Sequence, residues 1–238
     1  MRRKDSIYKS GLLAALKQLI MKQKFKAIIF DLDGTLVNTI DDLKRACDIV
    51  LKEYGRDYDW SIADYKKFVG NGIKKLVERA FDHTLNAAEL DEAFRKVSTI
   101  YNRIKLDNAH AYDGIKEQLA LLKEKGLKLA VVTNKPDNAA KDMVYHIFGK
   151  DTFDFISGAV EGIPHKPAPD STIRALKAIG CTAEEALFFG DSNVDMQTAK
   201  NAGIKAIGVT WGFRSKEELE KENPFAIISK TSDIIKQF

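Results

Sequence analysis

Short apolar runs alternate with longer amphipathic segments through most of the chain after residue 25. Short apolar runs bounded by turn-forming residues are typical of buried β-strands. They predict strands over 26–30, 127–133, 153–157, 185–190, 204–209 and 225–228. Between them, apolar residues recur at helical spacing and predict helices over 114–125, 137–148, 168–179 and 194–202. This alternation favours an α/β fold, a doubly wound and mostly parallel sheet with helices on both faces.

The region 39–110 departs from this alternation. It has no strand-like run, and its apolar spacing predicts helices over 40–54, 62–69, 71–81 and 87–106. About seventy residues are more than one crossover between neighbouring strands needs. We therefore expect three parts, which are an N-terminal extension at 1–24, a core formed by 25–38 and 111–238, and an inserted helical cap at 39–110.

The N-terminal extension is basic, and its apolar residues share one face of a helix predicted over 11–22. Packing of this helix on the core is the first interpretation, contact with a membrane surface or partner the second, and translation from Met21 the third. Residues 1–26 contain eight Lys or Arg and one Asp, a net +7, which leaves −3 of the total +4 for the other 212 residues. The body of the protein is therefore not basic, and we expect no nucleic-acid partner.

The overall composition is that of a soluble globular protein, with 45% hydrophobic and 30% charged residues. The two cysteines, Cys47 and Cys181, lack metal-ligand spacing and form no disulfide framework. Such cysteine usage fits the reducing cytoplasm. No apolar run approaches the roughly 18 residues that span a membrane. We expect a cytoplasmic protein, and the sequence gives no oligomeric state.

Two carboxylates stand where the first predicted strand ends. Asp31 follows the apolar run 27–30, Asp33 comes two residues later, and Gly34 allows a sharp turn. Ligands of open α/β sheets bind at the carboxyl ends of strands. A carboxylate there can attack phosphorus as a nucleophile, and a second one can give a proton to the leaving group. An acidic turn after a strand is the alternative interpretation of this segment alone.

Polar residues also follow the second predicted strand and precede a later helix. Thr133 and Asn134 place a hydroxyl and an amide where they can hold phosphate oxygens. Lys166 lies in the proline-rich segment 164–169, whose restricted backbone would fix a positive charge near an anionic transition state. Each segment alone is also explained by an ordinary turn or a solvated loop lysine.

The strand predicted over 185–190 leads into a second pair of acids, Asp191 and Asp195. Carboxylate oxygens that leave room for several waters suit Mg²⁺. The alternative is a helix after the strand whose N-cap is Asp191 or Ser192.

Four segments thus carry candidate chemistry, in the order acid pair, hydroxyl and amide, lysine, and second acid pair. Together they resemble the haloacid dehalogenase-like superfamily, and its phosphatase branch in particular. The resemblance covers essentially residues 25–215. It implies that Asp31 is the nucleophile and Asp33 the general acid and base. It implies phosphate binding by the motif residues Thr133, Asn134 and Lys166.

The same resemblance implies a Mg²⁺ cofactor. The implied ligands are Asp31, the backbone carbonyl of Asp33, and Asp191. Asp195 matches a further acid of the family, which binds the metal or its waters.

Within the predicted cap, residues 68–80 resemble phosphoglycolate phosphatases, as do residues 112–114, 131–136 and 209–212 outside it. The segment 158–162 and His165 depart from that pattern, which leaves the substrate open. The expected partner is a small phosphorylated metabolite, 2-phosphoglycolate or a similar ester.

Other activities on the same fold remain alternatives at this point. They are a pyrophosphatase, a nucleotidase, a β-phosphoglucomutase-like phosphomutase and a non-catalytic binding protein. Asp33 argues against a 2-haloacid dehalogenase and against a phosphonate hydrolase, since neither would need an acid at this position.

Overall fold

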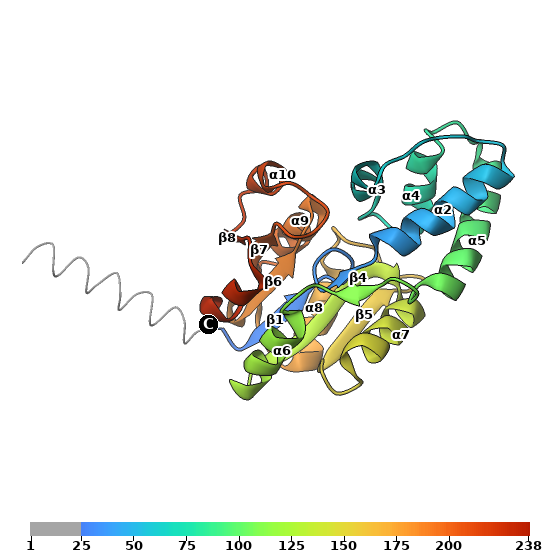
Figure 1. Cartoon of the computed structure of the whole chain (residues 1–238). Coiled ribbons are helices and arrows are strands. Elements are labelled where there is room, and N and C mark those ends of the chain that lie inside the picture. Colours follow the sequence, from blue (N-terminus) through green and yellow to red (C-terminus); the bar gives the residue numbers. More distant parts are fainter. Residues whose placement is uncertain (1–24) are drawn as a thin grey trace, which may run out of the picture.

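The computed structural model describes residues 25–238 and shows an α/β core with a bundle of helices at one end (Figure 1). The predictions for the extension at 1–24, its helix over 11–22 and the start at Met21 lie outside the described residues. The α/β class predicted from the sequence is confirmed.

The core is built on a six-stranded sheet with the order β5-β4-β1-β6-β7-β8. Its strands are β1 (Ala27–Phe30), β4 (Lys128–Pro136), β5 (Phe155–Ala159), β6 (Ala186–Gly190), β7 (Lys205–Val209) and β8 (Ala226–Ile228). All neighbouring strands run parallel, which confirms the predicted sheet. β4 continues to Pro136, beyond the predicted end at 133, so Asn134 and Lys135 belong to this strand.

Helices cover both faces of the sheet because successive strand residues point to opposite sides. In β1, Ile28 and Phe30 belong to the core on one face, and Ala27 and Ile29 to the core on the other. The first face is covered by α6 (Ile115–Glu124) and α7 (Asp137–Phe148). The second is covered by α8 (Asp170–Ile179), α9 (Asn193–Asn201) and α10 (Lys216–Glu220).

Between residues 38 and 110 the chain forms a bundle of α2 (Ile40–Glu53), α3 (Ile62–Phe68), α4 (Ile73–Ala80) and α5 (Ala87–Ile104). This α2–α5 bundle has a hydrophobic core of its own, which includes Val50, Leu76 and Val97. α4 begins at Ile73 instead of the predicted 71, because Gly70 and Gly72 have φ angles of 122° and 82° that no helix accommodates. The division of the chain into core and cap at 39–110 stays a prediction.

Several short elements escaped the sequence analysis. β2 (Val37–Asn38) and β3 (His110–Ala111) pair antiparallel where the chain leaves the core for the bundle and returns. The described part of the chain also contains three 3₁₀ helices, η1 (Ala183–Glu185), η2 (Thr231–Asp233) and η3 (Ile235–Gln237). Within residues 25–238, no helix is both long enough and apolar enough to cross a membrane.

Candidate active site

The predicted site residues gather at the carboxyl ends of β1, β4 and β6. β1 has β4 on one side and β6 on the other, so the sheet order reverses at β1. Such a switch point leaves a crevice at the strand ends, where ligands of open α/β sheets bind. Asp31, Thr133 and Asp191 reach this crevice from three neighbouring strands.

Asp31 is held rigidly at the end of β1. Its backbone N–H donates to the carbonyl of Phe189 at 2.9 Å, which continues the pairing of β1 with β6 by one residue. The side chain is almost fully buried, and Oδ1 lies 2.8 Å from the ammonium of Lys166. A carboxylate on a strand end, beside a fixed cation, is well placed to meet an anionic substrate.

Lys166 joins Asp31 to the second acidic segment. Its Nζ also donates to Asp195 Oδ1 at 2.7 Å, with the lysine side chain only 3% exposed. Asp195 Oδ2 accepts from the N–H and the hydroxyl of Ser192, at 3.0 and 2.6 Å. Ser192 is therefore the N-cap of α9, and both oxygens of Asp195 are engaged within the protein.

Asp191 is oriented by two donors. The N–H of Phe213 donates to Oδ2 at 2.7 Å, and the hydroxyl of Thr35 donates to Oδ1 at 3.2 Å. Gly34 lies against this carboxylate, and a Cβ at that position would lie 2.4 Å from Asp191 Oδ2. The sequence analysis singled out the turn at Gly34 but missed Thr35, whose role depends on a residue far along the chain.

Burial and crowding shift the pKa values of this cluster. Burial, together with the charge of Asp195, raises the pKa of Asp31 to about 7, against the opposing effect of Lys166. Burial and the charges of Asp195 and Asp31 raise the pKa of Asp191 to about 8. Burial lowers the pKa of Lys166, but the charges of Asp195 and Asp31 outweigh it and hold this pKa above its usual range. The site thus carries more negative charge than Lys166 neutralises.

Asn134 and Thr133 line the crevice from the end of β4. The side-chain oxygen of Asn134 accepts from the Lys166 N–H at 2.8 Å. Its amide nitrogen donates to the carbonyls of Lys166 and Gly70, at 3.1 and 3.2 Å. Asn134 therefore holds the segment around Lys166 and the loop before α4 in place. Phosphate binding by Thr133 and Asn134 stays a prediction.

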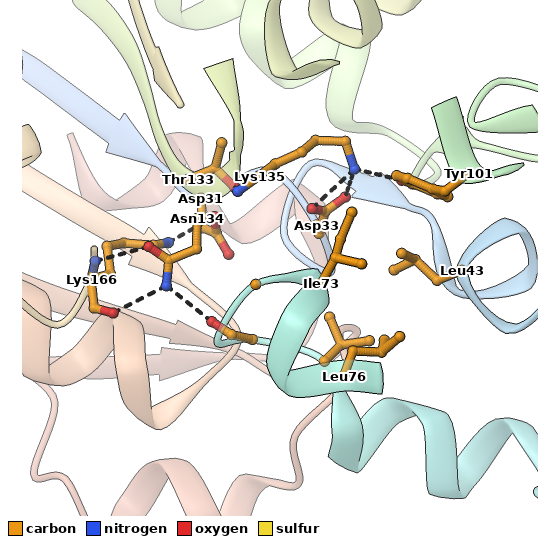
Figure 2. A pocket seen from close by; sticks show the side chains of 13 residues that line it. Asp31, Asp33, Leu43, Ile73, Leu76, Tyr101, Thr133, Asn134, Lys135 and Lys166 are labelled. Atoms are coloured by element: carbon orange, nitrogen blue, oxygen red, sulfur yellow. Dashed lines mark hydrogen bonds and ion pairs between the residues drawn. The ribbon is translucent and has the colours of Figure 1, made fainter. Parts of the chain in front are cut away.

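The Asp33 carboxylate faces the ammonium of Lys135, on the side of Tyr101 from the α2–α5 bundle (Figure 2). The ammonium of Lys135 lies 2.9 and 3.2 Å from its two oxygens and donates to the hydroxyl of Tyr101 at 2.5 Å. The sequence analysis missed both Lys135 and Tyr101 as site residues. Lys135 lies beyond the predicted end of its strand, among polar residues, and Tyr101 has the spacing of an ordinary core residue.

A pocket opens between the strand ends and the bundle (Figure 2). Asp31, Asp33 and Lys166 line it from the core side. The bundle lines it with apolar side chains and the glycine-containing loop before α4, namely Leu43, Val69, Gly70, Gly72, Ile73, Leu76 and Tyr101. The arrangement places charged groups on one wall and a mostly apolar surface on the other.

The acidic cluster fits a divalent metal ion. Asp31, Asp191 and Asp195 each bring one carboxylate oxygen within 4.8 Å of the others. Asp31 Oδ1 is buried and accepts no well-aligned hydrogen bond, although Lys166 Nζ lies close to it. Oxygen donors with surplus negative charge suit a hard divalent cation.

Comparisons with known proteins identify the family of this chain. The family model for haloacid dehalogenase-like hydrolases matches residues 28–209. The phosphoglycolate phosphatase of Pseudomonas syringae pv. syringae is 31% identical over 227 residues, which cover 94% of this chain and 83% of that protein. The phosphoglycolate phosphatase of Aquifex aeolicus is 32% identical over 211 residues, with coverage of 89% and 95%.

The chain is also similar to a solved structure. A protein of Lactobacillus delbrueckii subsp. bulgaricus with a proposed phosphoglycolate phosphatase activity superposes with a TM-score of 0.86 and 31% identity. The superposition covers 90% of this chain and 98% of that one. The chain belongs to the haloacid dehalogenase-like hydrolases, and it is a phosphatase.

Proposed function

We propose that this phosphatase is a Mg²⁺-dependent phosphomonoester hydrolase that acts through an aspartyl-phosphate on Asp31. The observation that carries the proposal is the setting of Asp31, which lies buried at the end of β1 with Lys166 Nζ at 2.8 Å and the Asp191 carboxylate nearby. A nucleophile of this kind needs a fixed position and compensation for its charge. The end of β1 fixes its position, Lys166 supplies a positive charge, and Asp191 offers a second carboxylate for a metal ion.

In the first step, an oxygen of Asp31 attacks phosphorus in line with the leaving oxygen. The bond from phosphorus to the leaving oxygen breaks with both electrons on that oxygen, and Asp33 gives it a proton. In the second step, Asp33 takes a proton from water, and the water oxygen attacks the phosphorus of the aspartyl-phosphate. Phosphate and the free carboxylate of Asp31 result, and the enzyme returns to its starting state.

The remaining residues stabilise charge and exclude water. Lys166 and Thr133 stabilise the oxygens of the phosphoryl group in transfer. Asp31, Asp191 and the carbonyl of Asp33 hold Mg²⁺, which offsets the repulsion between the nucleophile and the phosphate when it is bound. Residues 39–110, which contain the α2–α5 bundle, act as a cap over the site, and the apolar wall of this cap keeps bulk water from the intermediate.

The substrate in this proposal is 2-phosphoglycolate or a similar small phosphate ester. The named relatives support it, as does the confined space between charged strand ends and the apolar wall of Leu43, Ile73 and Leu76. A small metabolite fits such a site, whereas a polymer needs an open groove.

The test is phosphate release from a panel of 2-phosphoglycolate, hexose phosphates, nucleotides and pyrophosphate, with Mg²⁺ and with EDTA. We expect Mg²⁺-dependent release with a preference for 2-phosphoglycolate. Asp31→Asn should abolish release, while the matched exchange Asp57→Asn at an exposed loop position should leave it unchanged. Full activity of Asp31→Asn would refute the nucleophile.

A further inference from the structure

Lys135 is a buried cation that the proposed chemistry does not use. Its side chain is 2% exposed, yet it carries an ammonium in an apolar strand. Burying an ammonium costs several kcal/mol unless partners compensate. The compensating partners are the carboxylate of Asp33 and the hydroxyl of Tyr101.

The geometry around Lys135 directs it at Asp33 alone among the acids of the site. Its Nζ lies within 3.2 Å of both oxygens of Asp33, whereas Lys166 serves Asp31 and Asp195 on the other side of the crevice. Two contacts from one ammonium restrict rotation of a carboxylate more than one contact does. Lys135 thus fixes where the Asp33 oxygens stand relative to the pocket (Figure 2).

Tyr101 adds the second half of the arrangement, because it belongs to α5 of the bundle while Lys135 belongs to β4 of the core. Its hydroxyl accepts from Lys135 at 2.5 Å, and the ammonium lies 4.7 Å from the centre of its ring. Both contacts are lost if α5 moves away from β4. The position of Lys135, and through it that of Asp33, therefore depends on the bundle covering the site.

We propose that Lys135 and Tyr101 are positioning residues that hold the Asp33 carboxyl group in place for proton transfer when the bundle closes over the substrate. The inference rests on the proposed function, in which Asp33 gives its proton to the leaving oxygen as the phosphorus–oxygen bond breaks. Asp33 is therefore protonated before this step, and the carboxylate that remains after it is paired with Lys135, as in this structure. Because the Tyr101–Lys135 contact forms only when the bundle covers the site, proton transfer by Asp33 is efficient only in that closed state.

The test compares two substrates that differ in their need for a proton. The alkoxide that leaves 2-phosphoglycolate needs protonation, whereas 4-nitrophenolate leaves 4-nitrophenyl phosphate as a stable anion. Tyr101→Phe should lower kcat for 2-phosphoglycolate about tenfold, with KM nearly unchanged. The same variant should change kcat for 4-nitrophenyl phosphate less than about twofold, since general acid catalysis contributes little there.

Lys135→Met should lower kcat for 2-phosphoglycolate about 100-fold. It should again have little effect on kcat for 4-nitrophenyl phosphate. The double variant should be no worse than Lys135→Met alone, because both residues act on Asp33. Tyr65→Phe is the matched control. It removes another buried tyrosine hydroxyl of the bundle, one that donates to Asp48 at 2.8 Å, and it should leave both substrates unaffected.

Equal losses on the two substrates would overturn the proposal, as would a change confined to KM or a gain in kcat. Thermal melting and retained activity on 4-nitrophenyl phosphate report whether each variant is folded, and Tyr101→Phe decides the question if Lys135→Met does not fold. Failure of the wild type to hydrolyse either ester would instead refute the proposed function.

Discussion

The ammonium of Lys166 and the carboxylate of Asp195 form a buried ion pair, with 2.7 Å between Nζ and Oδ1. The pair links the loop before α8 to the first turn of α9, and Asp31 lies on the other side of the same ammonium. Asp195 thereby determines where the cation stands relative to the nucleophile.

Asp195→Asn should therefore destabilise the protein and reduce its activity together. Removal of the only partner of a buried charge costs about 3 to 5 kcal/mol. Lys166 keeps Asp31 as a partner, so we expect a smaller loss in the free energy of unfolding, which chemical denaturation would measure. Activity on the preferred ester should fall because Lys166 is no longer held beside Asp31. Ser192→Ala is the control, since loss of an N-cap alone costs about 1 kcal/mol and leaves the ion pair intact. Similar stability of the two variants would contradict this role of Asp195.

The stability of the metal-free protein should fall as the pH rises from about 4 to 8. The pKa values of Asp31 and Asp191 are raised from 3.8 to about 7 and about 8, so the folded state holds protons that the unfolded chain has released. Their contribution is complete below the unfolded value and is lost as the pH passes the folded values.

Thermal melting in EDTA at several pH values measures this dependence. Mg²⁺ should restore more stability at pH 8 than at pH 5, because it occupies the site of the departed protons. Asp191→Asn should flatten the curve, since it removes one of the two groups. A melting temperature that rises across this range in EDTA would show that the cluster is not charged as we infer.

Gly34→Ala should impair metal binding through Asp191. A Cβ at this position would lie 2.4 Å from Asp191 Oδ2, so the carboxylate has to move. We expect metal affinity to fall about 10- to 100-fold, as it does when groups that orient a ligand are removed. Isothermal titration with Mg²⁺ measures the change.

Gly55→Ala is the matched control for this exchange. Gly55 has φ +64°, close in strain to the +89° of Gly34, but nothing lies within 4 Å of the added carbon. Both variants bear a backbone cost of about 1 to 2 kcal/mol, and Gly34→Ala alone meets the acidic cluster. Equal Mg²⁺ affinity of Gly34→Ala and Gly55→Ala would contradict the predicted clash between the added carbon and Asp191.

Most of the sheet was predictable because each strand is a compact apolar run that needs only local sequence to be recognised. The same holds for Asp31 and Asp191, which follow such runs directly, and parallel strands bring their ends to one edge. The end of β4 was harder to place. Its last residues, including Lys135, are polar. The pairing with β5 is irregular between Val132 and Pro136 and resumes only at Pro136, which lies opposite Ala159.

The contacts that join the bundle to the core were beyond prediction from local pattern. Tyr101 occupies a helix position typical of packing, and its polar contact exists only because α5 lies over β4. Asn134 has the composition of a phosphate ligand, yet its amide is bound to backbone groups of Lys166 and Gly70. Such roles depend on how distant segments meet, which spacing along the chain does not determine.

The most direct test of the central claim is to trap the covalent intermediate. The wild-type protein, mixed with radiolabelled 2-phosphoglycolate and Mg²⁺ and quenched in acid within one turnover, should carry label on the peptide that contains Asp31. The account predicts this label, its loss in EDTA and its absence from Asp31→Asn. Rapid phosphate release with no label on the protein, or with label on another residue, would contradict it.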